Sequence, residues 1–480
     1  MNSSVASTRP IRPVAKNYQQ VMQKIPLQLW VGALLGALLL AAPRSRVVFG
    51  APIYFIDVLA FTLIIMPLKG QLHRWAPKIP ISKVVPVFMA AVVISELRGL
   101  LVYGTVLESV YMTARYMIAA SLFFTIPRLV SKPQHIDLLL KGLILGTLAS
   151  AVIVILYSLG PTRSLIVGAL FSNSLLNPGW ERLLRAIAIY GAGESAMRGR
   201  SLVGAATMTA GFLALTWPLA FVAYDRFKNT LLWKRIALAT VVIAPIGILM
   251  TYGRGAWLMV IVVVLLVGVF GLVSGRKILL AVVIGGGLAA TQMDIDMELF
   301  YFDRITESTQ ETMDNPFSDV STTERLLSFI QPFGHLVENP SWLLAGSGRA
   351  GQRATRRGNI GGQLYDEVGL ANHSAFSTAY YSFGVPAVVC QVLFVALGFL
   401  FTMKRAFRMK AADPHQKVVW QGLFMCWCTY SLWWASGHAV VGEPRGMMLS
   451  FLLFGLIVAF EKLRLIQLAE MRNKMGAKAH

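Results

Sequence analysis

The sequence predicts an all-α, polytopic integral membrane protein with about 12 transmembrane helices and a large periplasmic loop between helices 9 and 10. Hydrophobic residues make up 56% of the 480 residues and charged residues only 14%, whereas soluble domains have about 45–50% and ~25%. Many apolar runs approach the roughly 20 residues that a helix needs to cross a bilayer. The net charge is +21, but a nucleic-acid-binding protein would not be so apolar, so we expect no nucleic-acid partner.

Apolar runs bounded by charged residues, proline or glycine give twelve expected spans. Their approximate limits are 27–43, 47–67, 84–97, 105–127, 137–158, 201–224, 235–251, 255–274, 278–292, 384–403, 417–436 and 445–461. The expected regions are helices 1–9 in residues 1–292, with an outer loop at about 159–200, the large loop at 293–383, and helices 10–12 with a tail at 384–480. Residues 324–339 in the large loop have the pattern of an amphipathic helix, in which Pro332 introduces a kink.

The distribution of lysine and arginine supports this layout, because cytoplasmic segments retain positive charge. With the N-terminus inside, 27 of the 44 basic residues fall in inner segments, and these include all 16 lysines. Both termini are then expected in the cytoplasm. The remaining 17 basic residues are all arginines on the outer side.

An outer face with arginine and no lysine favours an anionic ligand. A guanidinium group is planar, permanently charged and matches phosphate with two N–H donors, whereas the lysine ammonium is a strongly hydrated point charge. The alternative is that insertion bias removed lysine from the outer segments and left a few structural arginines.

Residues 252–257 (YGRGAW) place Arg254 at the outer turn between the seventh and eighth spans. The glycines beside Arg254 let the backbone and a ligand approach closely, and a guanidinium near an aromatic ring at the membrane surface suits a lipid phosphate. Arg198 and Arg200 stand before the sixth span, where a helix N-terminus also favours an anion. Ordinary interfacial anchoring, or a solvated charge pair with Glu194, is the alternative for these arginines.

The large loop leads through His373 into the tenth span. A histidine ordinarily has a pKa near ~6.5 and can accept the proton of a hydroxyl nucleophile at neutral pH. A flexible, N–H-rich stretch upstream contains Gly346, Gly348 and Arg349, and Arg353 follows it. These four are candidate substrate-binding residues, although a glycine-rich segment alone is a weak sign of phosphate binding.

These features together resemble the bacterial O-antigen ligase and polysaccharide polymerase superfamily. The resemblance rests on Arg-Gly-Ala-Trp at the start of a span, Gly-Ser-Gly in a long outer loop and a histidine leading into a span. In O-antigen ligases the loop motif reads His, then Asn, Ser or Gln, nine residues, Gly, two residues, Gly. Here His373-Ser374 is followed by nine residues and Gly384, while Ala387 stands in place of the final Gly. The likeness covers roughly residues 195–390 and the layout of spans.

The resemblance implies an inverting, metal-independent glycosyltransferase without a cofactor or a bound metal. It would move a glycan from undecaprenyl diphosphate to a hydroxyl of a glycan or glycolipid acceptor, on the periplasmic face of a bacterial inner membrane. By the family's motifs, His373 would be catalytic and take the proton of the acceptor hydroxyl. Arg254 and either Arg198 or Arg200 would bind the diphosphate and stabilise the charge that develops as the glycosidic bond breaks.

Two other functions fit parts of this pattern. A polymerase of exopolysaccharide or O-antigen would use the same chemistry, and the motifs leave ligase and polymerase both open. A flippase for lipid-linked oligosaccharide, or another transporter, would also need arginines that face a diphosphate. Transport predicts charged residues in mid-span, whereas the expected spans hold few charged residues, among them Asp57, Glu108 and Arg115. An enzyme is therefore expected.

Overall fold

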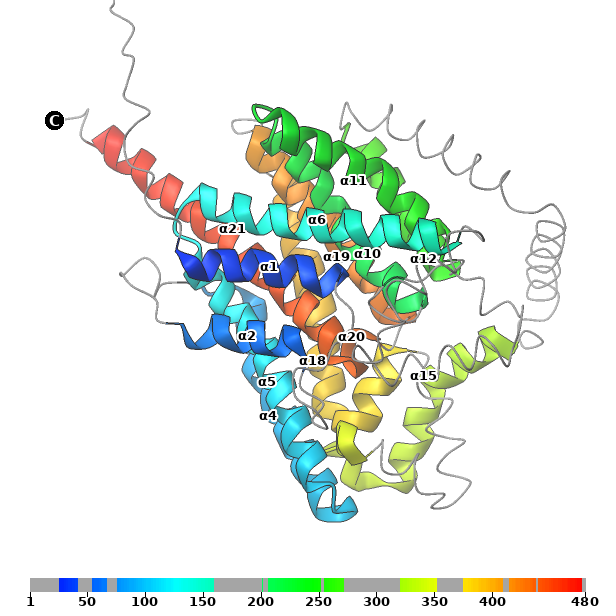
Figure 1. Ribbon diagram of the computed structural model, residues 1–480. Coiled ribbons are helices and arrows are strands. Elements are labelled where there is room, and N and C mark those ends of the chain that lie inside the picture. The colour runs from blue at the N-terminus through cyan, green and yellow to red at the C-terminus, as the bar shows by residue number, and fades with distance from the viewer. Residues whose placement is uncertain are drawn as a thin grey trace, which may run out of the picture.

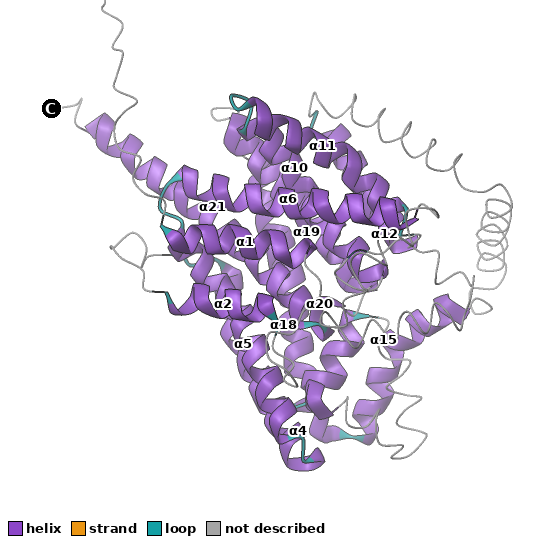
Figure 2. Cartoon of the chain, viewed as in Figure 1, coloured by secondary structure: helices purple, strands orange, loops and turns teal. Residues whose placement is uncertain are grey.

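The computed structural model describes residues 26–41, 54–66, 76–158, 201, 206–251, 254–271, 320–351, 374–408, 414–436 and 439–476. These residues form helices, with no β-strand among them (Figures 1 and 2). Among the described residues, six helices are long and apolar enough to cross a membrane, and three further apolar helices are shorter. The length and composition of the described helices are those of a multi-pass membrane protein.

The elements follow the expected order along the chain. They are α1 (Leu27–Ala41), α2 (Phe55–Ile65), η1 (Pro80–Lys83), α4 (Val84–Tyr103), α5 (Val106–Leu129), α6 (Pro133–Ser158), α10 (Ala206–Arg226), α11 (Leu231–Leu249), α12 (Arg254–Val269), α15 (Val320–Glu338), η2 (Pro340–Leu343), α18 (Ala375–Arg408), α19 (Pro414–Ser436), α20 (Ala439–Gly442) and α21 (Pro444–Gly476).

A described helix overlaps every expected span except 278–292, which lies outside the described residues. Two boundaries were wrong in a way that matters for the site. The helix expected to end at residue 97 continues to Tyr103, because the charged residues near its end are held by contacts with the 341–350 region. The helix expected to begin at residue 384 is preceded by a further helical segment that begins at Ala375, with a break between the two at Gly384. The number of spans and the periplasmic side of the loop stay predictions.

The core is built around α10, which is buried along nearly its whole length. Aromatic side chains from α18, α19 and α21 pack together beside it. The rings of Trp427 and Phe454 have centroids 4.5 Å apart, and Phe394 and Phe451 are 5.7 Å apart in a T-shaped arrangement. Such pairs add to the stability that burial alone gives.

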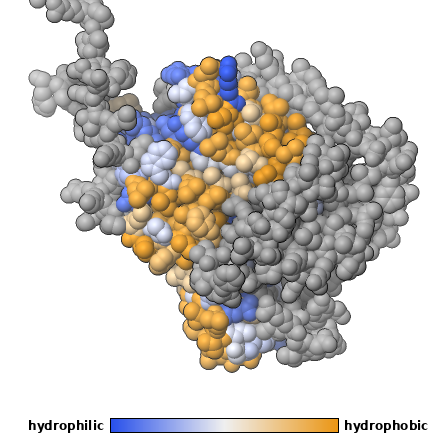
Figure 3. All heavy atoms as spheres, in the orientation of Figure 1, coloured by the Kyte–Doolittle hydropathy of each residue, from blue (hydrophilic) through white to orange (hydrophobic). Residues whose placement is uncertain are grey.

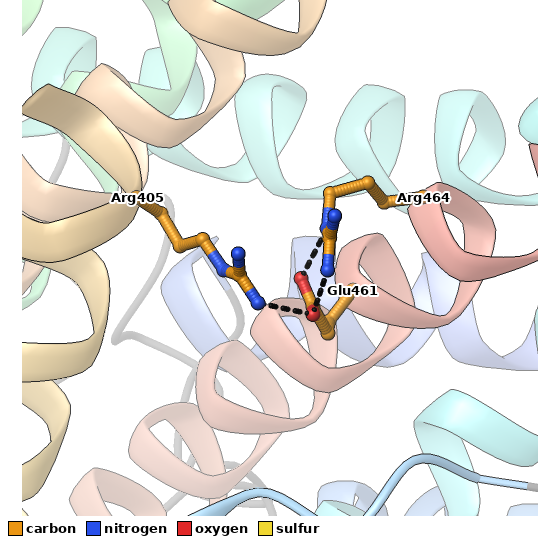
Figure 4. Close-up of polar contacts among 3 residues, drawn as sticks. All are labelled: Arg405, Glu461 and Arg464. Atoms are coloured by element: carbon orange, nitrogen blue, oxygen red, sulfur yellow. Dashed lines mark hydrogen bonds and ion pairs between the residues drawn. The ribbon is translucent and has the colours of Figure 1, made fainter. Parts of the chain in front are cut away.

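Ion pairs join helix ends that the charge distribution assigns to the inner side. Arg226 at the end of α10 pairs with Asp137 near the start of α6. Glu461 in α21 accepts hydrogen bonds from Arg405 of α18 and from Arg464, each at 2.6 Å (Figure 4). Basic residues that set the expected topology therefore also tie helix ends together.

Gly384 divides α18 into two segments. Its φ of 77° and ψ of −174° interrupt the helix, and Pro386 follows two residues later. A Cβ at this position would lie 2.9 Å from backbone atoms of Trp342, Ala345 and Gly346. Only glycine tolerates both the backbone conformation and the close approach of the 342–346 backbone.

We expect Gly384→Ala to destabilise the protein by roughly 1–3 kcal/mol, because the substitution adds a Cβ at a left-handed φ and into a closed contact. Thermal unfolding of the purified protein, followed by loss of helical circular dichroism, measures this effect. Gly268→Ala in α12 is the matched control, since a Cβ there would meet no atom within 4 Å. Equal unfolding temperatures for both variants would contradict the structural role of Gly384.

Candidate functional site

The starts of α10 and α18 lie together at the end of α19. Phe212, near the start of α10, packs edge-on against Trp433 with ring centroids 5.4 Å apart. Phe376, near the start of α18, packs against the neighbouring Trp434 at 6.5 Å. The residues that directly follow the Arg198–Arg200 pair and His373 therefore lie near one end of the bundle.

Of the expected site residues, Arg198, Arg200, Arg353 and His373 lie outside the described residues. Their nearest described neighbours are tied to the helix starts. Ser201 donates its backbone N–H to Thr209 Oγ1 at 3.3 Å, in the first turn of α10. Ser374, which follows His373, caps α18, since its Oγ accepts the N–H of Ser377 at 3.1 Å.

Arg254 is the first residue of α12, and its backbone but not its side chain is described. The Trp257 indole donates to the Leu249 carbonyl at 3.2 Å and ties the start of α12 to the end of α11. A short turn joins α10 to α11, so the end of α11 lies near the start of α10, as in any antiparallel helix pair. Arg254 consequently begins its helix at the same end of the bundle as Ser201.

The stretch from Gly346 to Ala350 is fixed between α4 and α18. Gly346 N–H donates to Ser95 Oγ at 3.1 Å, and the Ser347 hydroxyl donates to the Tyr381 carbonyl at 2.9 Å. The sequence predicts a flexible stretch here, and that prediction is wrong. The two neighbouring helices supply hydrogen-bond partners that a flexible segment would have to find in water.

Gly346 and Gly348 have packing reasons to be glycine. A Cβ on Gly346 would lie 2.5 Å from Phe383 N, where the backbone of the stretch crosses α18. Gly348 has a φ of 72°, and a Cβ there would lie 2.9 Å from Glu96 Oε2. The described contacts of both glycines are thus with α4 and α18.

Glu96 of α4 holds the residues that follow these glycines. Its carboxylate is 1% exposed and accepts the backbone N–H of Arg349 at 2.6 Å and that of Ala350 at 3.4 Å. A buried carboxylate is costly to desolvate, and hydrogen bonds from backbone N–H groups offset that cost. Glu96 therefore fixes where the Arg349 side chain begins.

The Arg349 side chain is buried between α18 and α20. A Cβ placed on Gly442 of α20 would lie 3.2 Å from Arg349 Nη2 and 3.0 Å from Thr378 Cγ2. Thr378 is one helical turn from Ser374, whose carbonyl accepts the Thr378 hydroxyl at 2.9 Å. The structure thus brings Arg349 within one turn of the residue that follows His373.

Arg98 of α4 was missed as a residue that shapes this region. Its guanidinium donates to the carbonyl of Ala345 and, at 3.0 Å, to Ser341 Oγ, and it lies 5.2 Å from the ring centroid of Trp342. The sequence signal for this role was the pair of charged residues at 96 and 98, at the end of an expected span, because charges in a membrane helix usually face protein partners.

Helix α15 and η2 cover the first segment of α18 through an aromatic cluster. His335 Nδ1 lies 3.0 Å from Tyr380 Oη, and the rings of Trp342 and Tyr380 stack at 5.7 Å. Phe329 and Phe333 of α15 pack against Phe376, with centroids 5.6 and 6.0 Å away. The amphipathic helix expected over 324–339 is confirmed, and it lies against the helix that follows His373.

A second set of buried charges is satisfied within the protein. Arg115 pairs with Asp57 at 3.0 Å, and its guanidinium lies 4.7 Å from the ring centroid of Tyr54. Arg445, at the start of α21, donates to the Leu38 and Leu39 carbonyls, each at 2.8 Å. These contacts favour the structural interpretation for Arg115 and Arg445.

Comparison of the chain with models of known protein families and with curated proteins gave no match. The described part of the chain is helical, with helices of the length and composition found in multi-pass membrane proteins.

We expect Glu96→Gln to loosen the stretch that carries Arg349, because the amide has one oxygen acceptor where the carboxylate has two. Loss of a charged hydrogen bond corresponds to faster exchange of the Arg349 and Ala350 amides by roughly tenfold or more. Hydrogen exchange measured on peptides covering 340–351 tests this. Glu470→Gln, on an exposed part of α21, is the control. Unchanged exchange in Glu96→Gln would contradict the anchoring role.

Proposed function

We propose that this protein is a glycosyltransferase that moves a glycan from undecaprenyl diphosphate to an acceptor hydroxyl on the periplasmic face of a bacterial inner membrane, in the manner of O-antigen ligases. The observation that supports this most is the convergence of the motif neighbours. Ser201 is tied to the first turn of α10, Ser374 caps α18, and these two helix starts meet at the end of α19. Arg349 lies beside the first turn of α18.

In this proposal the acceptor oxygen attacks the anomeric carbon of the donor sugar as the bond to the diphosphate breaks, and the configuration inverts. His373 takes the proton of the acceptor hydroxyl, and undecaprenyl diphosphate leaves with the bonding electron pair. Negative charge grows on the leaving oxygen during this step. Fixed guanidinium groups at that position stabilise the transition state more than the ground state.

The arginines would share the anionic donor. Arg254 and one of Arg198 and Arg200 bind the diphosphate, as the motifs suggest. Arg349 is added by its position beside Thr378, and we assign it, with Arg353, to the donor or acceptor near the diphosphate. Arginine suits this task because its planar group can present two N–H donors to one phosphate.

A polymerase is the second candidate, and one observation favours it. Ala387 stands where the ligase motif ends in glycine, so the chain matches the ligase motif incompletely. The two activities differ in product. A mass ladder of products that stay attached to undecaprenyl diphosphate indicates a polymerase, and a single transfer to a glycolipid indicates a ligase.

A flippase or transporter is less well supported. Transport through a bundle predicts charged groups available in mid-span, but Arg115 is buried and paired with Asp57. The motif neighbours gather instead at helix ends, which suits a reaction at a membrane surface.

We expect His373→Ala to lower the rate of glycan transfer by about 10²–10⁴-fold, the usual contribution of a general base. Transfer from lipid-linked donor is measured in membranes, and the inserted amount of each variant is compared by immunoblot. His415→Ala, at the start of α19 in an expected inner segment, is the control. Wild-type turnover by His373→Ala would exclude the residue as the base.

Arg254→Lys is expected to fail nearly as badly as Arg254→Ala, with a loss of roughly 10²–10³-fold, because lysine keeps the charge but cannot present two donors in a fixed fork. The same transfer assay measures both variants. Arg408→Lys, at the exposed end of α18, serves as the control for an arginine far from the motif. Full activity of Arg254→Lys would show that positive charge alone is sufficient.

A further inference from the structure

The turn between α4 and α5 is apolar and exposed, although it is the tip of a helical hairpin. Leu101 is 79% exposed and Leu107 is 81% exposed, and both helices are long and apolar enough to cross a membrane. Figure 3 shows apolar side chains at this end of the molecule, with hydrophilic ones beside them. Large apolar side chains gathered at this exposure are unfavourable in water, so the tip belongs in lipid.

Part of the expected periplasmic loop lies beside α4, inward of this tip. Arg98 binds Ala345 and Ser341, which places η2 against α4 at the level of residue 98. The hairpin turns at Gly104, about 9 Å farther along the helix axis at 1.5 Å per residue. If lipid surrounds the tip, η2 lies within lipid depth as well.

Exposed apolar side chains cover α15 and η2 on the outside. Ile330, Phe333 and Val337 have spacings of three and four residues and so lie on one helix face. Their side chains are 55%, 62% and 81% exposed, and Leu344 after η2 is 75% exposed. We name Ile330, Phe333, Val337, Leu343 and Leu344 the α15–η2 surface.

The sequence around this surface is poor in charge. Between Arg325 and Arg349, Glu338 is the single Asp, Glu, Lys or Arg. A loop that lies in water would carry more charged residues than this. In Figure 1, α15 and the α4–α5 turn lie on the side of the molecule away from the C-terminal end of α21.

The irregular backbone of this region is also compatible with lipid depth. Non-helical backbone is tolerated there only where protein satisfies its polar groups. The N–H groups of Gly346, Ser347, Arg349 and Ala350 all donate to α4 or α18. No water is needed to satisfy these donors.

We propose that the α15–η2 surface is embedded among the lipid acyl chains of the leaflet that surrounds the α4–α5 turn. Arg98 holds η2 against α4, and Ile94, Leu97 and Leu101 of α4 are also apolar and exposed. One layer of lipid would therefore cover both. This segment then re-enters the membrane instead of extending into the aqueous space. The inference does not depend on the proposed glycosyl transfer.

Spin labels measure this depth directly in the full-length protein reconstituted in lipid nanodiscs. Ile330→Cys, Val337→Cys and Leu344→Cys are labelled one at a time after Cys390, Cys426 and Cys428 are replaced by alanine. Leu107→Cys is the reference for lipid, and Asn229→Cys, in the exposed turn after α10, is the reference for water. The readout is collision with oxygen relative to a soluble nickel complex.

We expect the three labels to match Leu107→Cys, with an oxygen-to-nickel ratio roughly tenfold above that of Asn229→Cys, because oxygen partitions into acyl chains and the nickel complex stays in water. A ratio like that of Asn229→Cys would overturn the proposal, since the surface would face water. Labels that reach neither reagent would overturn it too, because another protein surface would then cover the segment. Should the cysteine-free chain fail to fold, bimane at the same positions in the native-cysteine chain, quenched by brominated lipid, gives the same comparison.

Discussion

The hydrogen bonds from the backbone of Arg349 and Ala350 to the Glu96 carboxylate are the constraint on which the candidate site depends. They join residues 253 and 254 positions apart in the sequence. A carboxylate buried in a membrane helix is expensive unless it is fully hydrogen bonded. Because the stretch after Gly348 supplies those bonds, α4 cannot bury Glu96 without also fixing this stretch. Folding of the N-terminal helices and assembly of the site are therefore coupled.

The fixed stretch in turn determines how α18 enters the bundle. Gly384 breaks α18 where the backbone of Trp342 to Gly346 passes within contact distance. The break lets residues 375–383 run as a separate helical segment whose first turn meets Arg349 and the end of α19. One close backbone crossing thus positions both the helix after His373 and a buried arginine. This arrangement is the physical reason to treat the glycine-rich stretch and the segment after His373 as one candidate site.

The sequence predicted the parts of this fold that depend on local pattern. Apolar runs located the helices, and the apolar periodicity of 324–339 located α15. Tertiary contacts were invisible to this reasoning. The charges of Glu96 and Arg98 indicate the end of a span. The groups that bind them lie more than 240 residues away in the sequence, so their burial could not be predicted. Residues 375–383 precede Gly384, where the expected span begins, yet they are helical and pack against α15 and α19.

The arginines of the expected outer side have more than one physical role. Arg98, Arg115 and Arg445 bind protein groups: carbonyls, a hydroxyl and a carboxylate. A guanidinium can satisfy several acceptors at once and keeps its charge when buried, whereas a buried lysine tends to lose its proton. Structural need therefore accounts for part of the preference for arginine. The proposed diphosphate ligand would account for a further part of the preference, at Arg254 and at Arg198 or Arg200.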